Sequence, residues 1–465
     1  MKKGFIQIMF ANMITLVIGV LTNFLLPKYL SYGSYADVKT YALYLTYAGF
    51  FSLGYNDGMY LKYGGKKISE IDNKGFGNNF LNYFVLIVGM SLLILLAGIF
   101  MKDQVIIAFS FGTLSYNILG YLKSFYQATG EFRLYGQSLN IEKELIFVFN
   151  MILIFLFKKD ASFYYIWIQV LCGLLICIYL SVKLNNKLHF MTGAKFSITE
   201  VKDNIKSGFI LMLGNFSSGV LTGIDRWFVK LFLTSVDFAK FSFAVSMENI
   251  INVFTMPVTI AMYNYFCKKP ELREIKLFKN ASLMWGALVI SLAYPSKFIL
   301  ENFLTKYQNA NEIIFILFAT QMFNIIVKGI YVNIYKSQKQ QNKYLKQMIF
   351  MLFFATVLDL TFVLLFNSML LIAIATLITT IVWLLICEFE KENEIRFSKN
   401  EYLYVIFILA VYLISGYVLN SIIGFFVFIL SFIILSLLLM RKTSFYLFKA
   451  VKQTFLKKIK QRFDC

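Results

Sequence analysis

Histidine, cysteine, proline and charged residues are all scarce in this sequence of 465 residues. The single histidine, His189, cannot build a histidine-based metal site, and its polar surroundings (KLNNKLHFMTG) are those of a solvated loop. The five cysteines include no C-x-x-C pair, and four of them lie in or beside apolar segments. We therefore expect buried cysteines that form neither disulfides nor metal sites.

Motifs for catalysis and for nucleotide binding are also missing. One loop histidine excludes a Ser/His or Cys/His catalytic centre. The sequence has no G-x-x-x-x-G-K-[S/T] loop, so ATP would not drive this chain directly. It has no D-x-D motif either, which disfavours a metal-dependent glycosyltransferase. We therefore expect a protein that is not an enzyme and that needs no cofactor and no metal.

Apolar residues dominate what is present. They make up 59% of the chain, with 51 Phe, while only 15% of residues are charged and only 4 are Pro. Soluble domains are nearer a quarter charged. So few prolines in so apolar a chain exclude disorder and proline-rich linkers. No compact soluble core could cover this much apolar surface, so the lipid bilayer is the expected solvent.

Apolar stretches of membrane-spanning length recur along the whole chain. We expect an all-α integral membrane protein with about fourteen transmembrane helices of roughly 20 residues each. The expected spans are residues 5–26, 39–61, 80–100, 105–127, 140–157, 162–182, 207–229, 240–264, 281–299, 312–335, 345–366, 368–388, 402–420 and 422–440. Asn367-Ser368 and Asn420-Ser421 are the short polar breaks within the last two pairs, as in tight helical hairpins.

The basic residues between the spans indicate the orientation. With the N-terminus inside, 34 of the 45 Lys and Arg face the cytoplasm and 10 face outward. This asymmetry predicts a cytoplasmic membrane protein with both termini in the cytoplasm. The net charge of +20 is then a membrane-orientation signal and not a nucleic-acid footprint. The first span is too long for a signal peptide and lacks an A-x-A site, so we expect an uncleaved helix.

A short internal repeat suggests two related halves. Gly19-Val20-Leu21-Thr22 recurs as Gly219-Val220-Leu221-Thr222, which pairs helix 1 with helix 7 in the same orientation. We expect six-helix bundles at residues 1–200 and 201–390, followed by helices 13 and 14 at 391–440. Residues 441–465 combine basic side chains with Phe and Ile at helical spacing, which predicts an amphipathic cytoplasmic tail. It would anchor the chain to the membrane or offer a partner site.

A few ionisable side chains fall inside the spans, where each is costly and therefore a candidate functional residue. They are Asp57, Asp225, Arg226, Glu248, Lys328 and Asp359. Several of them also have a simpler structural role open to them. Asp57 could reach the interface, Asp225 and Arg226 could pair or cap a helix, and Lys328 could extend toward the cytoplasm.

These residues suggest two kinds of chemistry. Burial raises the pKa of a carboxyl group, so Asp57, Asp225, Glu248 and Asp359 are candidates for binding a coupling H⁺ or Na⁺. A guanidinium can form two hydrogen bonds to a phosphate, and a lysine offers a point charge. Cationic side chains inside a cavity therefore suit a phosphate or pyrophosphate substrate.

Several motifs together resemble a known family. Pro27-Lys28-Tyr29-Leu30 ends the first helix, and Leu53-Gly54-Tyr55-Asn56-Asp57-Gly58 ends the second. Further matches are Gly33, Tyr35, Tyr126-Gln127-Ala128-Thr129-Gly130, Leu213-Gly214-Asn215, Asp225-Arg226 and Tyr335-Lys336-Ser337. In order and spacing these resemble the oligosaccharide flippases, which are the O-antigen and capsule-unit translocases of the multidrug/oligosaccharidyl-lipid/polysaccharide exporter superfamily.

The resemblance implies two pseudo-symmetric, MATE-like six-helix bundles around a central cavity, plus a terminal helix pair. It implies ion-coupled alternating access that carries a polyprenyl-pyrophosphate-linked glycan to the outer leaflet. Membrane lipids, a polysaccharide polymerase and other assembly proteins are candidate partners. By this resemblance a substrate role is carried only onto Arg226 and Lys328. Lipid II flippases hold more cavity arginines than this chain offers, so a peptidoglycan precursor is a less expected cargo.

Three alternatives remain open from the sequence. The first is a cation-coupled multidrug exporter of the same fold, which would favour a more acidic cavity. The second is a membrane enzyme of the same glycan pathway, and the third is a scaffold that recruits partners through its tail.

Overall fold

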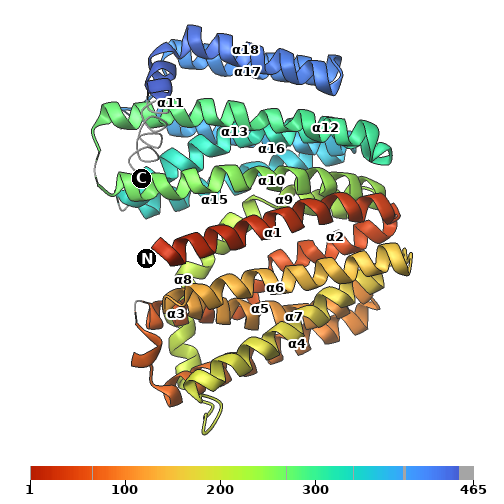
Figure 1. Ribbon diagram of the computed structural model, residues 1–465, viewed down its shortest axis with the longest axis vertical. Helices are drawn as coiled ribbons and strands as arrows, with labels where there is room; N and C mark the ends of the chain where they lie inside the picture. The colour runs from red at the N-terminus through yellow and green to blue at the C-terminus, as the bar shows by residue number, and fades with distance from the viewer. Residues whose placement is uncertain (1, 65, 269, 339, 391–393, 450–465) are drawn as a thin grey trace, which may run out of the picture. The chain divides into compact units, whose positions relative to one another are not determined.

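The computed structural model describes the chain except residues 1, 65, 269, 339, 391–393 and 450–465 (Figure 1). Within this described part the chain is helical and contains no strand. It divides into two compact units, unit 1 (Met1–Arg226) and unit 2 (Trp227–Cys465). The predicted all-α membrane fold is confirmed. The predicted divisions at residues 200, 390 and 440, and the pseudo-symmetry of the two bundles, stay predictions.

Unit 1 packs its helices around α5. The helix α5 contacts α2, α3, α4, α6 and α7, while α8 packs mainly against α3 and α1 packs against α6. The elements of unit 1 are α1 (Lys2–Tyr29), α2 (Tyr32–Thr46), η1 (Ala48–Ser52), α3 (Tyr55–Tyr63), η2 (Ile68–Glu70), α4 (Asn73–Met101), α5 (Gln104–Ala128), α6 (Phe132–Met151), η3 (Ile152–Leu156), α7 (Ser162–Leu188) and α8 (Ile198–Leu221). The next helix, α9 (Ile224–Phe232), runs across the division between the units.

Unit 2 has α13 at its centre, in contact with α10, α11, α12, α16 and α17. Its elements are α10 (Ser235–Phe266), α11 (Leu272–Val289), η4 (Ile290–Leu292), α12 (Ala293–Asn302), η5 (Thr305–Ala310), α13 (Asn311–Ile326), η6 (Val327–Tyr331), α14 (Val332–Ser337), α15 (Gln341–Phe366), α16 (Met369–Phe389), α17 (Lys399–Val418) and α18 (Ser421–Leu439).

Short polar residues begin and end these helices where the sequence predicts loops. The side chain of Asp103 accepts the backbone N–H of Val105 at 2.8 Å and so caps α5. Asn420 caps α18 in the same way, through Ile423 N–H at 2.8 Å. At the C-terminal end of α15, Asn367 adopts a left-handed backbone conformation with φ +48°. The two predicted hairpin breaks are therefore confirmed, and α15–α16 and α17–α18 pack as neighbours.

Helix length and composition indicate which helices could cross a membrane. Among the described residues, nine helices are long and apolar enough to cross a membrane, and the bent pair α8–α9 could add one more. The predicted count of fourteen stays a prediction. Two predicted spans differ from single straight helices, because 39–61 is divided into α2, η1 and α3, and 207–229 is interrupted at Thr222-Gly223.

Two buried lysines of unit 2 hold the ends of α17. Lys279 on α11 lies 3.7 Å from Glu388 and 3.5 Å from Glu401, and the side chains of Lys279 and Glu388 are 1% and 0% exposed. Lys297 on α12 donates hydrogen bonds of 2.7 Å to the carbonyls of Gly416 and Leu419. A lysine there satisfies carbonyls that a helix end leaves unpaired. The hairpin α17–α18 is thus an integral part of unit 2.

The chain continues as a helix directly after α18. Residues 441–449 are helical, with Phe445 and Phe448 exposed beside exposed Arg441 and Lys442. This arrangement agrees with an amphipathic segment at a membrane surface. The rest of the predicted tail, 450–465, lies outside the described residues.

Candidate functional site

A break between α2 and α3 brings Asp57 to the interior of unit 1. Leu53 and Gly54 both have left-handed backbone conformations, with φ +50° and +86°. Glycine takes this conformation without the strain that a side chain adds. The turn ends η1 and starts α3 in a new direction, with Asp57 in the first turn of α3.

Glycines press α3 directly against α8. A Cβ atom on Gly58 would lie 2.3 Å from the Asn204 carbonyl oxygen, and one on Gly208 would lie 2.1 Å from the Gly54 carbonyl oxygen. Gly54 and Gly58 form the G-x-x-x-G spacing that allows two membrane helices to approach closely. This contact fixes Asp57, which lies between the two glycines, relative to α8.

A cavity of about 550 Å³ lies next to this break, within unit 1. Its walls come from α2, η1, α3, α5, α6 and α8, and its volume is within the range of ligand pockets. Its lining mixes apolar side chains with hydroxyl, amide and charged groups. The polar and charged lining residues are Thr46, Tyr47, Ser52, Asn56, Asp57, Tyr116, Asn117, Lys123, Ser124, Glu142 and Lys143.

An ion pair lies in the cavity wall between α5 and α6. The Nζ of Lys123 is 3.4 Å from a carboxylate oxygen of Glu142, and both side chains are about a quarter exposed. Between α3 and α5, Asn56 Nδ2 donates a 3.3 Å hydrogen bond to Ser124 Oγ. The cavity can therefore present both signs of charge and several hydrogen-bonding groups to a polar ligand.

A layer of tyrosines and asparagines supports the α5 wall of this cavity. Tyr121 and Tyr83 stack with their ring centroids 4.7 Å apart. Tyr121 donates to the Asn79 side chain at 2.7 Å, and Tyr83 donates to the Asn117 carbonyl at 3.2 Å. Asn117, which lines the cavity, in turn donates to the Ala48 carbonyl at 2.9 Å. These buried hydrogen bonds hold α5 in register with η1 and α4.

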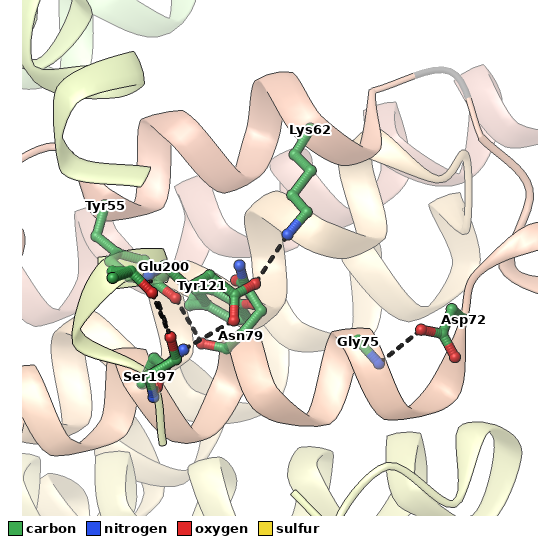
Figure 2. Close-up of polar contacts among 10 residues, drawn as sticks. Tyr55, Lys62, Asp72, Gly75, Asn79, Tyr121, Ser197 and Glu200 are labelled. Atoms are coloured by element: carbon green, nitrogen blue, oxygen red, sulfur yellow. Dashed lines mark hydrogen bonds and ion pairs between the residues drawn. The ribbon is translucent and has the colours of Figure 1, made fainter. Parts of the chain in front are cut away.

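Next to this layer, Glu200 at the start of α8 forms an ion pair with Lys62 (Figure 2). Glu200 accepts from Lys62 of α3 and from Asn82 of α4, each at 3.0 Å. Burial raises the pKa of the neighbouring Tyr63 phenol, and the carboxylates of Glu200 and Asp72 raise it further. The first turn of α8 is therefore tied to both α3 and α4.

The other predicted residues near the end of unit 1 are neighbours of each other. Asp225 is buried in the first turn of α9, and its Oδ1 accepts the backbone N–H of Arg226 at 2.7 Å. This is the helix-end arrangement that the sequence left open for Asp225. Arg226 is half-buried, and its guanidinium lies against Gly223.

Unit 2 brings Glu248 and Lys328 together. Glu248 on α10 accepts hydrogen bonds from Gln321 at 2.5 Å and Thr320 at 3.4 Å, both on α13. Lys328 is half-buried on the π-helical turn η6 and interacts electrostatically with Glu248. Such π-turns inside helices are frequent at functional sites. Polar groups from α10, α13 and η6 therefore meet inside unit 2.

Asp359 is only 2% exposed, although α15 is mostly exposed along its length. Its side chain therefore faces the protein interior and not the lipid. Asp359 has a polar or electrostatic partner within the described residues. Burying a carboxylate this deeply in a spanning helix costs free energy, so such residues are candidates for a functional role.

Comparison with protein families identifies the group to which this chain belongs. The family model described as "Polysaccharide biosynthesis protein" matches residues 1–269. The chain belongs to this family. The matched region contains all of unit 1, with the cavity and the glycine contact, and it extends through Glu248 into unit 2.

Solved structures share the fold of this polysaccharide biosynthesis family member. Lipid II flippase MurJ, in an inward closed conformation, superposes with a TM-score of 0.74 over 94% of this chain and 99% of that chain, at 16% identity. Two structures of multidrug resistance MATE family transporters of the MOP superfamily give TM-scores of 0.53 (inward-facing) and 0.50 (outward-facing), at 13% and 15% identity. The matches cover 81% and 88% of this chain and 93% and 96% of those chains. The comparison with curated proteins gave no match.

These comparisons confirm part of what the sequence predicts. The resemblance to the polysaccharide unit flippases is confirmed as family membership, and the MATE-like fold is confirmed by the solved structures. The solved structures that share this fold are those of a flippase and of a transporter. Within the described residues, no group of three or more His, Cys, Asp or Glu could hold a metal ion.

Sequence reasoning missed three charged residues of the cavity. Lys123, Glu142 and Lys143 lie near the predicted ends of spans, so the orientation count treats the two lysines as surface charges. A signal for them was available, since Glu142-Lys143-Glu144 lies in the middle of the helix α6. A run of charges in the middle of a helix whose second half is apolar points to a cavity or a partner helix.

Proposed function

We propose that this protein translocates a polyprenyl-pyrophosphate-linked oligosaccharide unit from the inner to the outer leaflet of the bacterial cytoplasmic membrane. The translocated unit would serve surface polysaccharide assembly. The observation that carries the proposal is the charged, hydroxyl-rich cavity of unit 1 in a member of a polysaccharide biosynthesis family. The fold shared with a lipid II flippase supports the same class of cargo.

The cavity suits the polar part of such a lipid. A glycan needs many hydrogen-bonding partners while it crosses the hydrocarbon layer, and the lining offers hydroxyl and amide groups. A pyrophosphate needs cationic partners. Lys123 and Lys143 line the cavity of unit 1 and are candidate ligands of the pyrophosphate. Arg226 and Lys328, which do not line this cavity, stay separate candidates from the sequence.

Transport against a gradient also needs a source of energy. Differential affinity for the cargo in two conformations does not by itself drive net movement. We propose that H⁺ or Na⁺ binding at one or more of Asp57, Asp225, Glu248 and Asp359 supplies the direction. The burial of Asp225 and Asp359 supports this role, because the protonation or ion occupancy of a buried carboxylate is strongly coupled to its surroundings.

Lipid analysis of a deletion strain tests the proposal most directly. Polyprenyl-linked glycans would be extracted and identified by mass. Build-up of a complete, unpolymerised unit on its carrier, reversed by re-expression, is the expected result. A normal lipid profile in a strain without a second flippase of this family would contradict it.

A second function, cation-coupled export of organic cations, is favoured by one observation. Asp57 and Glu142 give the cavity two carboxylates, and the fold is shared with multidrug resistance MATE transporters. This alternative predicts that the deletion strain gains sensitivity to cationic drugs and keeps a normal lipid profile. Lys123 and Lys143 weigh against it, because they repel a cationic ligand.

A further inference from the structure

A second, apolar pocket lies in unit 1, away from the charged cavity. It has a volume of about 400 Å³ and is formed by residues 77–84 of α4, 114–118 of α5, 174–182 of α7 and 190–194 of the following loop. Among its lining residues only Ser181 and Cys177 carry a polar side-chain group. Phe84, Ile178 and Met191 are exposed at its rim, so the pocket opens to the membrane side.

The loop that closes one end of this pocket is held in place by hydrogen bonds. The backbone N–H of Lys195 donates to Asn78 at 2.6 Å, that of Ser197 donates to Asn82 at 2.8 Å, and that of Met191 donates to Asn185 at 3.0 Å. Left-handed turns at His189 and Gly193, with φ +46° and +74°, shape the loop. The pocket is therefore preformed.

Cationic side chains lie beside the closed end. Lys195 follows Ala194, which lines the pocket, and Lys74 lies one turn before Gly77 on α4. Both lysines are exposed, and the described residues provide neither ammonium group with a partner. The positive-inside orientation places this end at the cytoplasmic surface, where anionic lipid headgroups are concentrated.

The pocket and the substrate cavity use different faces of α5. Leu114 and Ile118 line the pocket, whereas Gly120 and Lys123 line the cavity. At about 3.6 residues per turn these two pairs lie on roughly opposite sides of the helix. A lipid chain in the pocket is therefore separated by α5 from a headgroup in the cavity, which disfavours the isoprenoid tail of the cargo as the occupant.

We propose that this pocket binds one acyl chain of an anionic phospholipid of the inner leaflet, with the phosphate of that lipid held by Lys74 and Lys195. The bound lipid supports α5 from the side opposite the cavity. This lipid site is separate from the site of the transported molecule. The proposal depends only on membrane insertion and on the predicted orientation, and not on the proposed transport function.

Photo-crosslinking of the purified full-length protein in nanodiscs tests the site. The probe is phosphatidylglycerol with a diazirine on one acyl chain, compared with the same chain on phosphatidylethanolamine. We expect crosslinks on peptides that contain Phe84, Ile178 or Met191, and stronger labelling by phosphatidylglycerol. In the Lys74→Gln/Lys195→Gln variant the preference for phosphatidylglycerol should fall about fivefold for each lysine removed.

A pocket-filling variant separates the site from general lipid contact. Ala194→Trp should abolish labelling of these peptides, and Leu96→Trp, at an exposed position of α4 outside the pocket, should leave it unchanged. Unchanged labelling in Ala194→Trp, or an equal response to both headgroups, would overturn the proposal. Displacement of the probe by a polyprenyl phosphate but not by phosphatidylglycerol would overturn it in favour of the cargo tail.

Discussion

Lys123 and Glu142 face each other across the α5–α6 wall of the unit 1 cavity, with 3.4 Å between the ammonium nitrogen and the carboxylate oxygen. Neither residue is exposed to bulk solvent by more than about a quarter. In a cavity that binds an anionic headgroup, the carboxylate of Glu142 occupies the position that a phosphate oxygen would take. An anionic ligand must therefore compete with Glu142 for Lys123.

Removing one member of this pair should shift anion affinity in opposite directions. We expect Glu142→Gln to bind inorganic pyrophosphate more tightly, by up to about fivefold, since a partly exposed ion pair is worth about 0.2–1 kcal/mol. Lys123→Gln should weaken binding at least about tenfold, since hydrogen bonds to charged groups are worth about 1.5–3 kcal/mol. Isothermal titration of the purified variants measures both, with Lys102→Gln as a control outside the cavity. Equal affinities in both cavity variants would remove the pair from the site.

The glycine contact between α3 and α8 should not tolerate a methyl group. Gly208→Ala places a Cβ 2.1 Å from the Gly54 carbonyl oxygen, so the helices must separate. We expect a loss of about 1–3 kcal/mol, the usual cost of overpacking, and a lower midpoint of thermal unfolding in detergent. Gly214→Ala, on the same helix, has no atom within 4 Å of the added Cβ and should unfold like the wild type. Equal loss in both variants would show that the close contact with Gly54 is not the cause, since Ala has the higher helix propensity.

The sequence predicts the helical elements well because apolar length and polar breaks are local properties. Asn367 and Asn420 mark two helix junctions where the structure has them. The sequence predicts a helix end at the motif Leu53–Gly58 but not the turn into α3, because that turn is fixed by the contact with Gly208 on a distant helix. The sequence of a single span does not predict a contact with a distant helix.

The candidate site could be predicted only in part, for a related reason. Asp57 stands out because a carboxylate inside an apolar span is rare. Lys123 and Glu142 do not stand out, because charges near the end of a span are ordinary. Their meeting depends on how α5 packs against α6, which the sequence pattern of either helix does not contain. The same holds for Lys279 and Glu388, which the sequence assigns to a loop and to a span end.

The buried contact between Lys279 on α11 and Glu388 on α16 should be needed for the stability of unit 2. Glu388→Ala leaves the ammonium group of Lys279 buried with one carboxylate fewer, and we expect a loss of about 3–5 kcal/mol. The double variant Lys279→Met/Glu388→Gln should recover much of this loss, because the buried ammonium group is gone and Glu401 keeps its hydrogen bonds from Asn280 and Ser398. Thermal unfolding of the purified variants measures the difference. A double variant as unstable as Glu388→Ala would contradict the electrostatic explanation.

Asp359→Asn should change how transport depends on the ion gradient. The buried carboxylate can bind H⁺ or Na⁺, whereas the isosteric amide cannot be ionised. We expect the purified variant to insert normally and to translocate a fluorescent polyprenyl-linked glycan in vesicles, with a rate that no longer responds to an imposed H⁺ or Na⁺ gradient. Glu312→Gln, at the start of α13, is a matched carboxylate control. An unaltered gradient response in Asp359→Asn would remove Asp359 from ion coupling.

Arg226→Ala should weaken transport without loss of membrane insertion, because the guanidinium is a proposed ligand of the pyrophosphate. Translocation of the same glycan by the purified variant measures the effect, and Arg226→Lys tests whether charge alone is sufficient. Arg441→Ala, in the exposed segment after α18, serves as a control for loss of an arginine. Wild-type translocation by Arg226→Ala would exclude Arg226 from the substrate site.

The predicted orientation can be tested with a native cysteine. Cys267 is exposed in the segment between α10 and α11, while Cys172, Cys177 and Cys387 are buried. The orientation places Cys267 in the cytoplasm, so a membrane-impermeant maleimide should label it only after the cells are permeabilised. Cys465→Ser removes the remaining thiol of the predicted cytoplasmic tail, and an added cysteine at Lys102 provides a position predicted to face outward. Labelling of Cys267 in intact cells would contradict the predicted orientation. It would mean that the topology is inverted and that the basic segments lie at the outer surface.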